Sequence, residues 1–364
     1  MKIVQVQTQA EAAGAQRISD MVGEGLRARG HDVRTVFMYR KTDAFDHDAN
    51  ADFILTERPG GLRGQIRAAI GLAVYLRKAR PDAVITYQHY GNIFGTIGAR
   101  LAGVRHIVAN QSGQPHTRGV MGLLSQVDKL MGVVGLYETN VVNSAWTQQQ
   151  FDHYPQAYRR RIRRIDHGVP VPTGEFDKAA ARLAFGLPQN VWLAVSSGRL
   201  TQTKNQIALV GALEHLPNVH VALAGVGPEQ DTLVAFAESR GVTDRLHLVG
   251  EVPPSRIFEF LAAGDAYAFP SMMETFGLAC VEAAISGLPI VTGNLDVMRE
   301  VLTTEDGEAA AIFVEADAKG MARGLADMIA RPESMATLSA AGRRLKDKYS
   351  LAKMCAGYEK LLVS

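Results

Sequence analysis

The stretch Asp166-His167-Gly168-Val169-Pro170-Val171-Pro172-Thr173-Gly174 divides the sequence into two halves with the same pattern. Two prolines and two glycines within nine residues favour a linker over a helix or a strand. Before this stretch, short β-rich runs alternate with helical patterns, beginning with a strand over residues 2–7 and a helix over 15–29. After it, the alternation restarts with a strand over residues 192–196. Alternation of this kind predicts parallel sheets covered by helices on both faces.

The remaining runs repeat the alternation on both sides of the linker. Helices are predicted over residues 62–80 and 93–101, and further strands over 32–39, 83–86, 105–109, 140–143, 219–223, 246–248, 266–269 and 290–291. We therefore expect an α/β protein with two doubly wound, Rossmann-like domains that face a central cleft. These domains span residues 1–167 and 168–345, and a C-terminal helical segment spans 346–364. In such folds, ligands bind at the carboxyl ends of the strands.

The composition of the 364 residues is that of an ordinary globular protein, with 47% hydrophobic and 21% charged residues. Cys280 and Cys355 are too few for a disulfide scaffold or a cysteine-rich metal site, which favours a reducing compartment. The N-terminus lacks the apolar core of a signal peptide, and no apolar run reaches the roughly 18 residues that a membrane span needs. A cytoplasmic location is expected.

The net charge of +2 conceals a difference between the two halves. Residues 1–167 hold 22 Lys and Arg against 14 Asp and Glu, whereas the remainder holds 17 against 23. The basic excess gathers in two clusters: Arg63, Arg67, Arg77, Lys78 and Arg80, and Arg159, Arg160, Arg161, Arg163 and Arg164. An anionic acceptor or the headgroup layer of a membrane would explain both clusters, and so would solvated helix faces. Nucleic acid is not expected as a partner, because the clusters lack interleaved aromatic residues.

The segment Pro270-Ser271-Met272-Met273-Glu274-Thr275-Phe276-Gly277-Leu278-Ala279-Cys280-Val281-Glu282-Ala283-Ala284 follows a predicted strand and contains a turn and the start of a helix. Glu274 precedes the helix, and Glu282 is predicted about two turns into it. Gly277 allows the backbone to approach a ligand closely, and the N–H groups of a first helical turn suit an anion. The two carboxylates can accept hydrogen bonds from hydroxyls of an elongated polyol, although two solvated charges at a helix terminus would give the same pattern.

Two further turns follow strands of the second half. Ser196-Ser197-Gly198-Arg199-Leu200-Thr201-Gln202-Thr203-Lys204-Asn205 presents Arg199 and Lys204, a planar cation and a point charge that suit a diphosphate, although surface charges would look the same. Leu223-Ala224-Gly225-Val226-Gly227-Pro228-Glu229 matches only part of a dinucleotide-binding fingerprint. Such turns also serve merely to connect a strand to a helix.

Together these segments resemble the retaining glycosyltransferases of family 4 (glycosyl transferases group 1), which have the GT-B fold. The resemblance implies that Arg199 and Lys204 hold the donor diphosphate and act in catalysis. It implies that Glu274 contacts the donor sugar and that Glu282 binds the ribose hydroxyls. Further donor contacts are implied at Gly198, Gly225, Gly227, Thr275, Phe276, Gly277 and Leu278. The C-terminal segment is expected to pack back on the first domain.

The resemblance is weaker in the first half. Of the family's glycine-rich loop after the first strand only Gly14 remains, where we expect the backbone to approach the donor. Gln111 or Ser112 occupies the place of the family's histidine near the donor sugar, so His116, a few residues later, is the candidate catalytic group at the anomeric centre. His89, just beyond a strand, is the candidate on the acceptor side. A surface histidine without a role is the alternative for both.

The predicted activity is retaining transfer of a hexose from a GDP- or UDP-sugar to a hydroxyl of a glycan or lipid-linked acceptor. The resemblance favours mannose as the hexose. The expected setting is cell-envelope, exopolysaccharide or lipopolysaccharide assembly, with the protein at the inner face of the membrane. No metal or other cofactor is expected, because cationic side chains can do the work of a metal at the diphosphate. The alternatives are a nucleotide-sugar 2-epimerase of the same architecture and a non-catalytic nucleotide-sugar-binding subunit.

Overall fold

The computed structural model describes residues 1–11, 14–111, 113–115 and 118–363. The chain forms two compact units, Met1–Gly168 with Leu351–Ser364, and Val169–Ser350. The first break follows Gly168, inside the proline- and glycine-rich linker. The second follows Ser350 rather than residue 345. In the described ranges, none of the helices combines the length and the hydropathy needed to cross a lipid bilayer.

The first unit is built on a seven-stranded parallel sheet in the order β3-β2-β1-β4-β5-β6-β7. Its strands are β1 (Lys2–Ala10), β2 (Asp32–Arg40), β3 (Ala51–Leu55), β4 (Ala83–Tyr87), β5 (His106–Gln111), β6 (Thr139–Val142) and β7 (Ile162–Arg164). Strand β4 is an uninterrupted run of buried residues, as expected for a central parallel strand with helices on both faces. The order reverses at β1, so the carboxyl ends of β1 and β4 flank a topological switch point.

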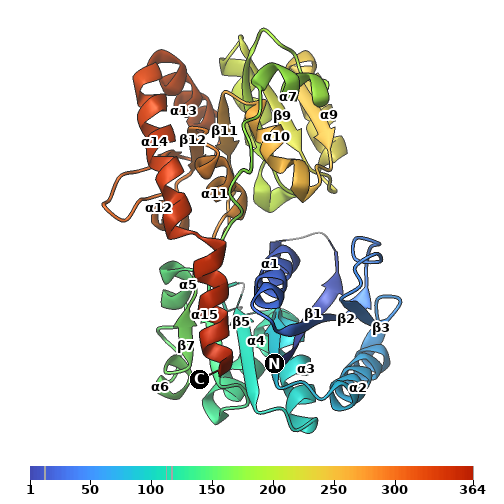
Figure 1. Ribbon diagram of the computed structural model, residues 1–364. Coiled ribbons are helices and arrows are strands. Elements are labelled where there is room, and N and C mark those ends of the chain that lie inside the picture. Colours follow the sequence, from blue (N-terminus) through green and yellow to red (C-terminus); the bar gives the residue numbers. More distant parts are fainter. Residues whose placement is uncertain (12–13, 112, 116–117, 364) are drawn as a thin grey trace. The chain divides into compact units, whose positions relative to one another are not determined.

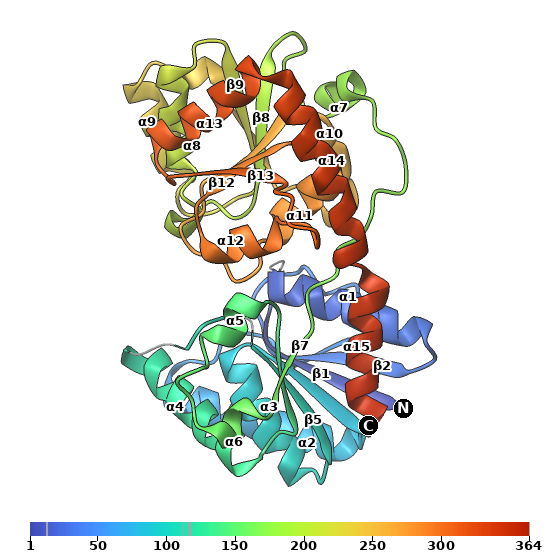
Figure 2. The same cartoon turned by 90° about the vertical axis from the view of Figure 1, so that its left-hand side faces the viewer.

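Helices cover both faces of this sheet (Figures 1 and 2). On one face lie α1 (Gly14–Ala28) and α15 (Leu351–Val363), and on the other α2 (Gly61–Ala79), α3 (His89–Leu101) and α4 (Gly119–Val134). The short helices α5 (Ala145–Gln149) and α6 (Gln156–Arg159) follow β6. Connections toward β3 and connections toward β7 leave the sheet on opposite faces because crossovers between parallel strands are right-handed.

Helix α15 packs directly on α1. A Cβ atom added at Gly25 would lie 2.1 Å from Cys355 Sγ, so only a glycine allows the helices to approach this closely. Glu359 of α15 lies 3.0 Å from His31 Nε2 and 3.2 Å from Arg29 Nε. The last helix therefore belongs to the first unit, although the whole second unit separates them in the sequence.

The second unit has a six-stranded parallel sheet in the order β10-β9-β8-β11-β12-β13. Its strands are β8 (Trp192–Ser197), β9 (Val219–Ala224), β10 (Leu246–Gly250), β11 (Ala266–Phe269), β12 (Ile290–Gly293) and β13 (Ala311–Val314). Its helices are α7 (Lys178–Ala184), α8 (Ile207–Ala212), α9 (Gln230–Ser239), α10 (Ile257–Ala262), α11 (Leu278–Ile285), α12 (Asp296–Val301), α13 (Ala318–Ala330) and α14 (Pro332–Lys348). Four 3-10 turns complete it: η1 (Gln202–Lys204), η2 (Leu213–His215), η3 (Thr243–Arg245) and η4 (Pro254–Arg256).

The predicted α/β class with two Rossmann-like domains is confirmed. Three strands were not predicted, β3, β7 and β13, and all three lie at sheet edges. Every residue of β3 is only half-buried, and two of the three residues of β7 are exposed arginines. Edge strands do not need a continuous apolar run, and charged side chains on them prevent pairing with other chains. This explains why β3 and β7 were missed, whereas β13 was missed although its residues Ala311–Val314 are all apolar.

Candidate functional site

The carboxyl ends of β8, β9 and β11 bring three predicted motifs of the second unit together. Strand β8 lies between β9 and β11 and runs parallel to both, so the loops that follow the three strands leave the same edge of the sheet. These loops contain residues 198–204, 225–227 and 270–277. In open α/β sheets this edge is where ligands bind.

The glycines after β8 and β9 allow the two loops to pack backbone against backbone. A Cβ atom at Gly225 would lie 2.1 Å from the Gly198 carbonyl oxygen, and one at Gly227 would lie 2.2 Å from the Leu200 carbonyl oxygen. The Leu200 N–H donates to the Val226 carbonyl at 3.1 Å. Gly198 and Gly225 have φ angles of 145° and 142°, which favour glycine. This packing gives the glycines a structural role, and their contacts with a donor stay a prediction.

Lys204, at the end of η1, is paired with Glu274 in the loop after β11. Its Nζ lies 2.5 Å from Glu274 Oε1 and 4.9 Å from the centre of the Phe269 ring. The side chains of Lys204 and Glu274 are 26% and 10% exposed. The ion pair is therefore partly shielded from water, where it is stronger than a surface pair.

The 3-10 turn η1 is fixed to the loop after β11. Asn205 follows η1 with a φ of 56°, a conformation that asparagine tolerates better than most residues. Its Nδ2 donates to the carbonyl oxygens of Pro270 at 3.2 Å and Ala316 at 2.6 Å. The Met272 N–H donates to the Thr203 carbonyl at 2.9 Å. The two turns thus form one assembly that holds the ion pair.

Arg199 is exposed at the same edge of the sheet. Its carbonyl accepts a hydrogen bond from Gln206 Nε2 at 3.0 Å, which fixes the backbone of the loop. Within the part of the chain that the structure describes, the Arg199 guanidinium forms no ion pair, whereas Lys204 does. Of the two predicted cations, Arg199 is therefore exposed without a carboxylate partner among the described residues, and Lys204 has one.

Helix α11 begins directly after Gly277, which has φ 79° and ψ 52°, in the left-handed region. A Cβ atom there would lie 2.8 Å from Met298 Sδ. The N–H groups of the first turn, Leu278 and Ala279 among them, have no acceptors within the helix. The helix begins at Leu278, and Glu282 is its fifth residue. Glu282 therefore lies little more than one turn into the helix, and the prediction of two turns is wrong. Its side chain is buried, with the residue 2% exposed.

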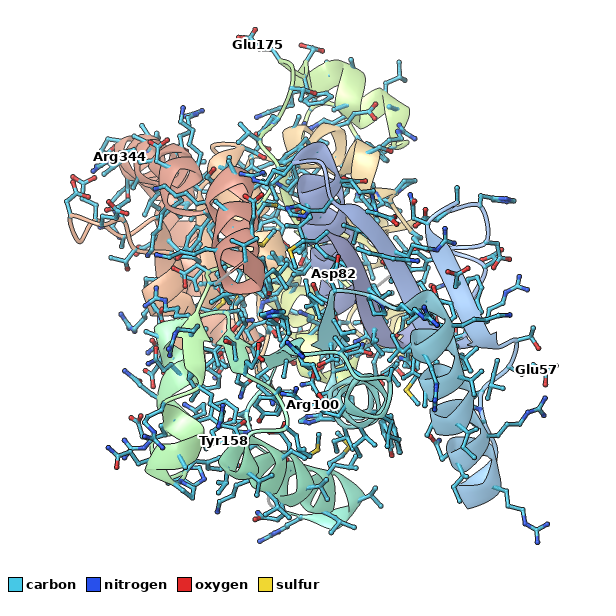
Figure 3. All side chains as sticks on the ribbon, turned by 60° about the horizontal axis from the view of Figure 1, so that its bottom comes forward. Glu57, Asp82, Arg100, Tyr158, Glu175 and Arg344 are labelled. Atoms are coloured by element: carbon cyan, nitrogen blue, oxygen red, sulfur yellow. The ribbon has the colours of Figure 1, made fainter. Side chains whose placement is uncertain are left out.

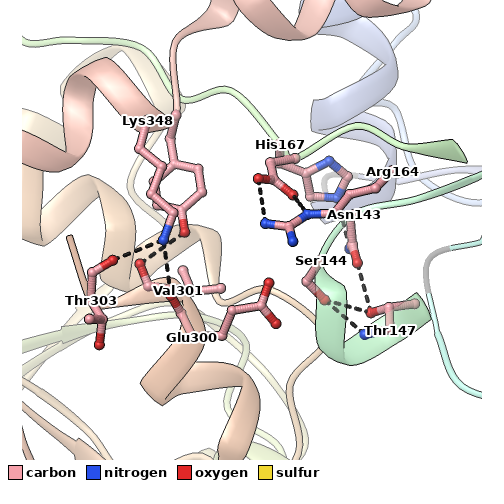
Figure 4. A network of polar contacts seen from close by, with 11 residues as sticks. Asn143, Ser144, Thr147, Arg164, His167, Glu300, Val301, Thr303 and Lys348 are labelled. Carbon is pink, nitrogen blue, oxygen red and sulfur yellow. Dashed lines mark hydrogen bonds and ion pairs between the residues drawn. The ribbon is translucent and has the colours of Figure 1, made fainter. Parts of the chain in front are cut away.

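The Phe276 side chain faces the interior of the second unit. It is buried, and its ring centre lies 5.1 Å from that of Tyr349 in a T-shaped arrangement. Beside it, Lys348 Nζ donates to the Glu300 carbonyl at 3.1 Å (Figure 4). Any ligand contact at Phe276 must therefore come from its backbone, whereas Thr275 is half-buried.

Two ionisable groups beneath the site are held neutral. Burial raises the pKa of the Cys280 thiol well above its ordinary value, and the nearby Glu274 carboxylate adds to the rise. Burial also raises the pKa of Tyr267, whose hydroxyl lies 3.0 Å from Ser197 Oγ at the end of β8. Neither group carries a negative charge at physiological pH, so neither competes with Glu274 for the Lys204 ammonium.

The first unit places its own candidates at strand ends. Gly14 is the exposed first residue of α1, and His89 is the half-buried first residue of α3. Gln88, between β4 and α3, has φ 64° and ψ 163°, a region that strains any residue with a Cβ atom, and its Oε1 accepts from the Thr8 N–H at 3.2 Å. Sequence reasoning missed Gln88 because a dihedral angle leaves no signal in the sequence. His116, the predicted catalytic histidine, lies outside the described residues.

Gln111, at the end of β5, is held by a buried polar network that sequence reasoning also missed. Its Nε2 donates to Asp128 Oδ2 at 3.0 Å, and Asp128 also accepts from the hydroxyls of Tyr158 at 2.8 Å and Tyr137 at 3.3 Å. Burial raises the pKa of Asp128 to about 6, although the three donors favour its ionised form. The signal that could have revealed it is Asp128 itself, the one acidic residue of a mostly apolar helix whose only other charged residue is Lys129.

A second polar cluster of the first unit lies beside the linker (Figure 4). His167 Nε2 lies 3.0 Å from Asn143 Nδ2, and burial lowers the pKa of His167 to about 3. Ser144 Oγ accepts from the Thr147 N–H at 3.0 Å and caps α5. His167 is therefore a neutral group that helps to order the end of the first unit.

Across the described ranges, no group of three or more His, Cys, Asp or Glu side chains is arranged to hold a metal ion. The Asp-x-Asp spacing occurs once in the sequence, at Asp46 and Asp48, between β2 and β3. Asp46 pairs with Arg40, and Asp48 accepts from the Asn50 N–H at 2.8 Å. These carboxylates stabilise a loop of the first unit.

Two doubly wound parallel sheets, with cations and a carboxylate gathered at the strand ends of the second, define a two-domain Rossmann-like protein. The profile of the family described as Glycosyl transferases group 1 matches residues 177–345, and that described as Glycosyl transferase 4-like domain matches residues 13–167. The chain belongs to the group 1 glycosyltransferases of GT-B fold.

Curated relatives match part of the chain. The D-inositol 3-phosphate glycosyltransferase of Mycolicibacterium vanbaalenii is 32% identical over 228 residues, which cover 57% of this chain and 49% of that protein. The protein of the same name from Mycolicibacterium smegmatis is 34% identical over 42% of this chain and 36% of its own length. The chain thus spans half or less of the length of the curated relatives it matches.

Solved structures match the whole chain. Sucrose-phosphate synthase from Thermosynechococcus elongatus superposes with a TM-score of 0.82 at 18% identity and covers 99% of this chain and 98% of its own. The HepE protein of Anabaena, in complex with UDP and glucose, superposes with a TM-score of 0.83 at 19% identity and full coverage of both chains. At these identities the similarity establishes the fold.

Proposed function

We propose that this protein is a retaining glycosyltransferase that moves a hexose from a nucleotide-diphosphate sugar to an acceptor hydroxyl. The observation that carries the proposal is the convergence of Arg199, Lys204 and Glu274 at the edge where β8, β9 and β11 end. Cations at this edge suit a diphosphate, and a partly shielded carboxylate suits sugar hydroxyls. Membership of the group 1 family supports the same reaction.

Cleavage of the bond between the sugar and the diphosphate leaves negative charge on the departing phosphate. Cations that meet this charge as it develops stabilise the transition state more than the ground state. In our proposal the exposed Arg199 receives the diphosphate first, and Lys204 then exchanges Glu274 for a phosphate oxygen. The released Glu274 becomes an acceptor for a sugar hydroxyl. The reaction as proposed requires no metal ion.

The donor proposed is a UDP- or GDP-hexose. The Anabaena HepE structures contain UDP and UDP-glucose, which supports a uridine nucleotide. The resemblance to mannosyltransferases of polysaccharide assembly supports GDP-mannose instead. Retention of configuration is proposed from the family, with the leaving phosphate assisting attack on the same face of the sugar.

The acceptor proposed is a glycan or a lipid-linked sugar of the cell envelope, met at the cytoplasmic face of the membrane. The curated relatives are named for the acceptor D-inositol 3-phosphate, and WaaG, whose fold matches this chain, is described as a glycosyltransferase of lipopolysaccharide biosynthesis. A phosphorylated acceptor would also suit the basic excess of the first half.

Thermal unfolding with a panel of nucleotide sugars tests the donor, because a true donor at about 100 times its Kd stabilises a protein by about 2.7 kcal/mol. Product analysis then tests the reaction. An epimerised nucleotide sugar formed without an acceptor would identify a 2-epimerase. A donor that binds and is never transferred or hydrolysed would identify a binding subunit.

Variants test the site. Lys204→Ala and Glu282→Ala are each expected to lower transfer at least ten-fold, because Lys204 meets the leaving phosphate in the proposed complex and Glu282, as the family resemblance implies, binds the ribose hydroxyls. Lys178→Ala serves as the control, since it removes an ion pair with Asp265 that lies before the start of β11. If both site variants retain full transfer activity, the site assignment is wrong.

A further inference from the structure

The outward face of the helices α2, α3 and α4 is apolar where solvent-facing helices are normally polar. Of the eighteen exposed large hydrophobic side chains among the described residues, nine lie on these three helices. The helices pack side by side on one face of the first sheet, α2 against α3 and α3 against α4 (Figures 2 and 3). An exposed apolar surface of this extent on a folded unit marks an interaction site.

Helix α4 is apolar on its outward side as well as on the side that packs on the sheet. The outward stripe consists of Val120, Leu123, Leu130 and Val134, each between 60% and 65% exposed. The inward side contains the buried Ser125, Asp128 and Met131, and Leu124, Val127 and Val133 pack against the core. An ordinary helix on a sheet has an apolar inward side and a polar outward side. Packing in this unit therefore does not account for the outward stripe.

Helix α2 combines an apolar stripe with cations. Ile66, Ile70 and Val74 recur every four residues and are between 48% and 60% exposed. The exposed residues of the same outward side also include Arg63, Arg67, Arg77 and Lys78. Long basic side chains beside aliphatic ones are typical of helices that lie in the interface of a lipid bilayer.

Carboxylates are missing from this surface in the sequence itself. Residues 61–80 and 89–101 contain no Asp or Glu, and the only acidic residue of 119–134 is the buried Asp128. On α3, Ile97 and Leu101 add apolar exposure between the other two helices. The surface is thus apolar and purely cationic, which suits an anionic partner with an apolar interior.

We infer that this surface, formed by the outward sides of α2, α3 and α4, docks the first unit on an anionic lipid bilayer. The aliphatic side chains enter the boundary of the acyl layer, and the arginines meet lipid phosphates. A second copy of the chain fits less well, because a symmetric contact would place this cationic surface against its own copy without carboxylates to pair the basic residues. The inference deepens the proposed function, in which a lipid-linked acceptor is one of two acceptor classes, but its test measures binding alone.

Flotation of the full-length protein with vesicles tests the inference. The wild-type protein is expected to float with phosphatidylcholine vesicles that contain phosphatidylglycerol and not with phosphatidylcholine alone. The variant Arg67→Gln with Arg77→Gln is expected to bind about 30-fold more weakly, since each basic residue near an anionic surface contributes roughly five-fold. Raising the salt from about 0.1 M to 1 M, which shortens the Debye length from about 10 Å to 3 Å, should remove this difference.

Apolar variants separate docking from simple charge attraction. Ile70→Ser with Leu123→Ser is expected to weaken binding at least ten-fold at either salt concentration, because aliphatic burial is not screened. Leu183→Ser on α7 of the second unit is the matched control, since Leu183 is 78% exposed and lies outside the surface. All these positions are exposed, so thermal unfolding should be unchanged in every variant.

Three results would overturn the inference. The first is that the wild-type protein does not float with either kind of vesicle. The second is that Leu183→Ser weakens vesicle binding as much as Ile70→Ser with Leu123→Ser does. The third is that light scattering shows a dimer, that Ile70→Ser with Leu123→Ser dissociates it, and that vesicles are not bound. Transfer to a water-soluble acceptor is measured in parallel. Its persistence in a protein that fails to bind vesicles would refute the docking surface and leave the proposed reaction standing.

Discussion

The ion pair between Lys204 and Glu274 makes a directional prediction about nucleotide binding. Glu274→Gln keeps the shape of the side chain but removes its charge. Because Lys204 then no longer has to leave a carboxylate, we expect UDP or GDP to bind more tightly to Glu274→Gln than to the wild-type protein. Lys204→Ala is expected to bind the same nucleotide more weakly. The two members of one ion pair should thus have opposite effects.

The magnitude follows from the geometry of the pair. A hydrogen bond between charged groups contributes about 1.5–3 kcal/mol net, and the 2.5 Å contact with a 10% exposed Glu274 side chain belongs to this class. Glu274→Gln should lower the Tm of the unliganded protein by about 3–12 °C, at roughly 2–4 °C per kcal/mol. In the variant, nucleotide binding no longer has to break the Lys204–Glu274 pair, so the affinity for UDP or GDP should rise about ten-fold or more.

Calorimetric titration with UDP and GDP measures this effect without the sugar, which keeps the proposed contact of Glu274 with the sugar out of the result. Lys178→Ala is the matched control, since Lys178 Nζ lies 2.7 Å from Asp265 in the same unit but at the amino end of β11. It should leave nucleotide affinity unchanged. Weaker nucleotide binding by Glu274→Gln, comparable to that of Lys204→Ala, would refute the exchange of partners at Lys204.

Gly225→Ala is expected to destabilise the second unit by about 3 kcal/mol in chemical denaturation, because the added Cβ would lie 2.1 Å from the Gly198 carbonyl oxygen; Gly174→Ala, with no atom within 4 Å, is the control and should change little. Gln88→Gly and Gln88→Ala both lose the acceptor of the Thr8 N–H, but only glycine relieves about 1–3 kcal/mol of backbone strain, so the Gly variant should have the higher Tm, and a higher Tm for Gln88→Ala would contradict the strain. Asp20→Asn should stabilise the protein by about 1–3 kcal/mol at pH 8 and hardly at pH 4. Burial, with Asp48 and Glu24 nearby, raises the pKa of Asp20 from 3.8 to about 7. The folded state therefore prefers the protonated acid, and the wild-type protein loses stability as the pH rises from 3.8 to about 7. An equal gain from Asp20→Asn at both pH values would exclude ionisation of Asp20 as the cause.

The sequence predicted the architecture because buried parallel strands need apolar runs and the linker needs glycine and proline. Strands such as β4 and β11 are buried along their whole length, so their composition reveals them. The edge strands β3 and β7 escaped prediction because one partner and one exposed side relax that requirement. The same reasoning placed each of the three motifs after a strand, and the carboxyl ends of neighbouring parallel strands meet at one edge of the sheet.

The internal geometry of the candidate site could not be predicted in the same way. The pairing of Lys204 with Glu274 depends on the left-handed conformation of Asn205 and on hydrogen bonds that join two turns 65 residues and more apart. The strain at Gln88 depends on a dihedral angle. Helix α4 was not predicted from the sequence, and its composition does not say which of its leucines and valines face the core, as Leu124 does, and which face outward, as Leu123 does. Local patterns cannot separate the two sides of a helix that is apolar on both.

The uneven charge of the two halves can now be assigned to particular surfaces. The second half is net acidic, so its overall field does not favour a diphosphate, and in the proposed complex Arg199 and Lys204 act locally. In the first half, Arg161 donates to the Gly132 carbonyl at 2.8 Å and Arg164 pairs with Asp166 at 2.5 Å, so part of the second basic cluster stabilises the fold. The arginines of α2 lie instead among exposed aliphatic residues on a surface without carboxylates. Solvated helix faces would explain basic residues alone, but they do not explain why the same surface is apolar, and a bilayer explains both.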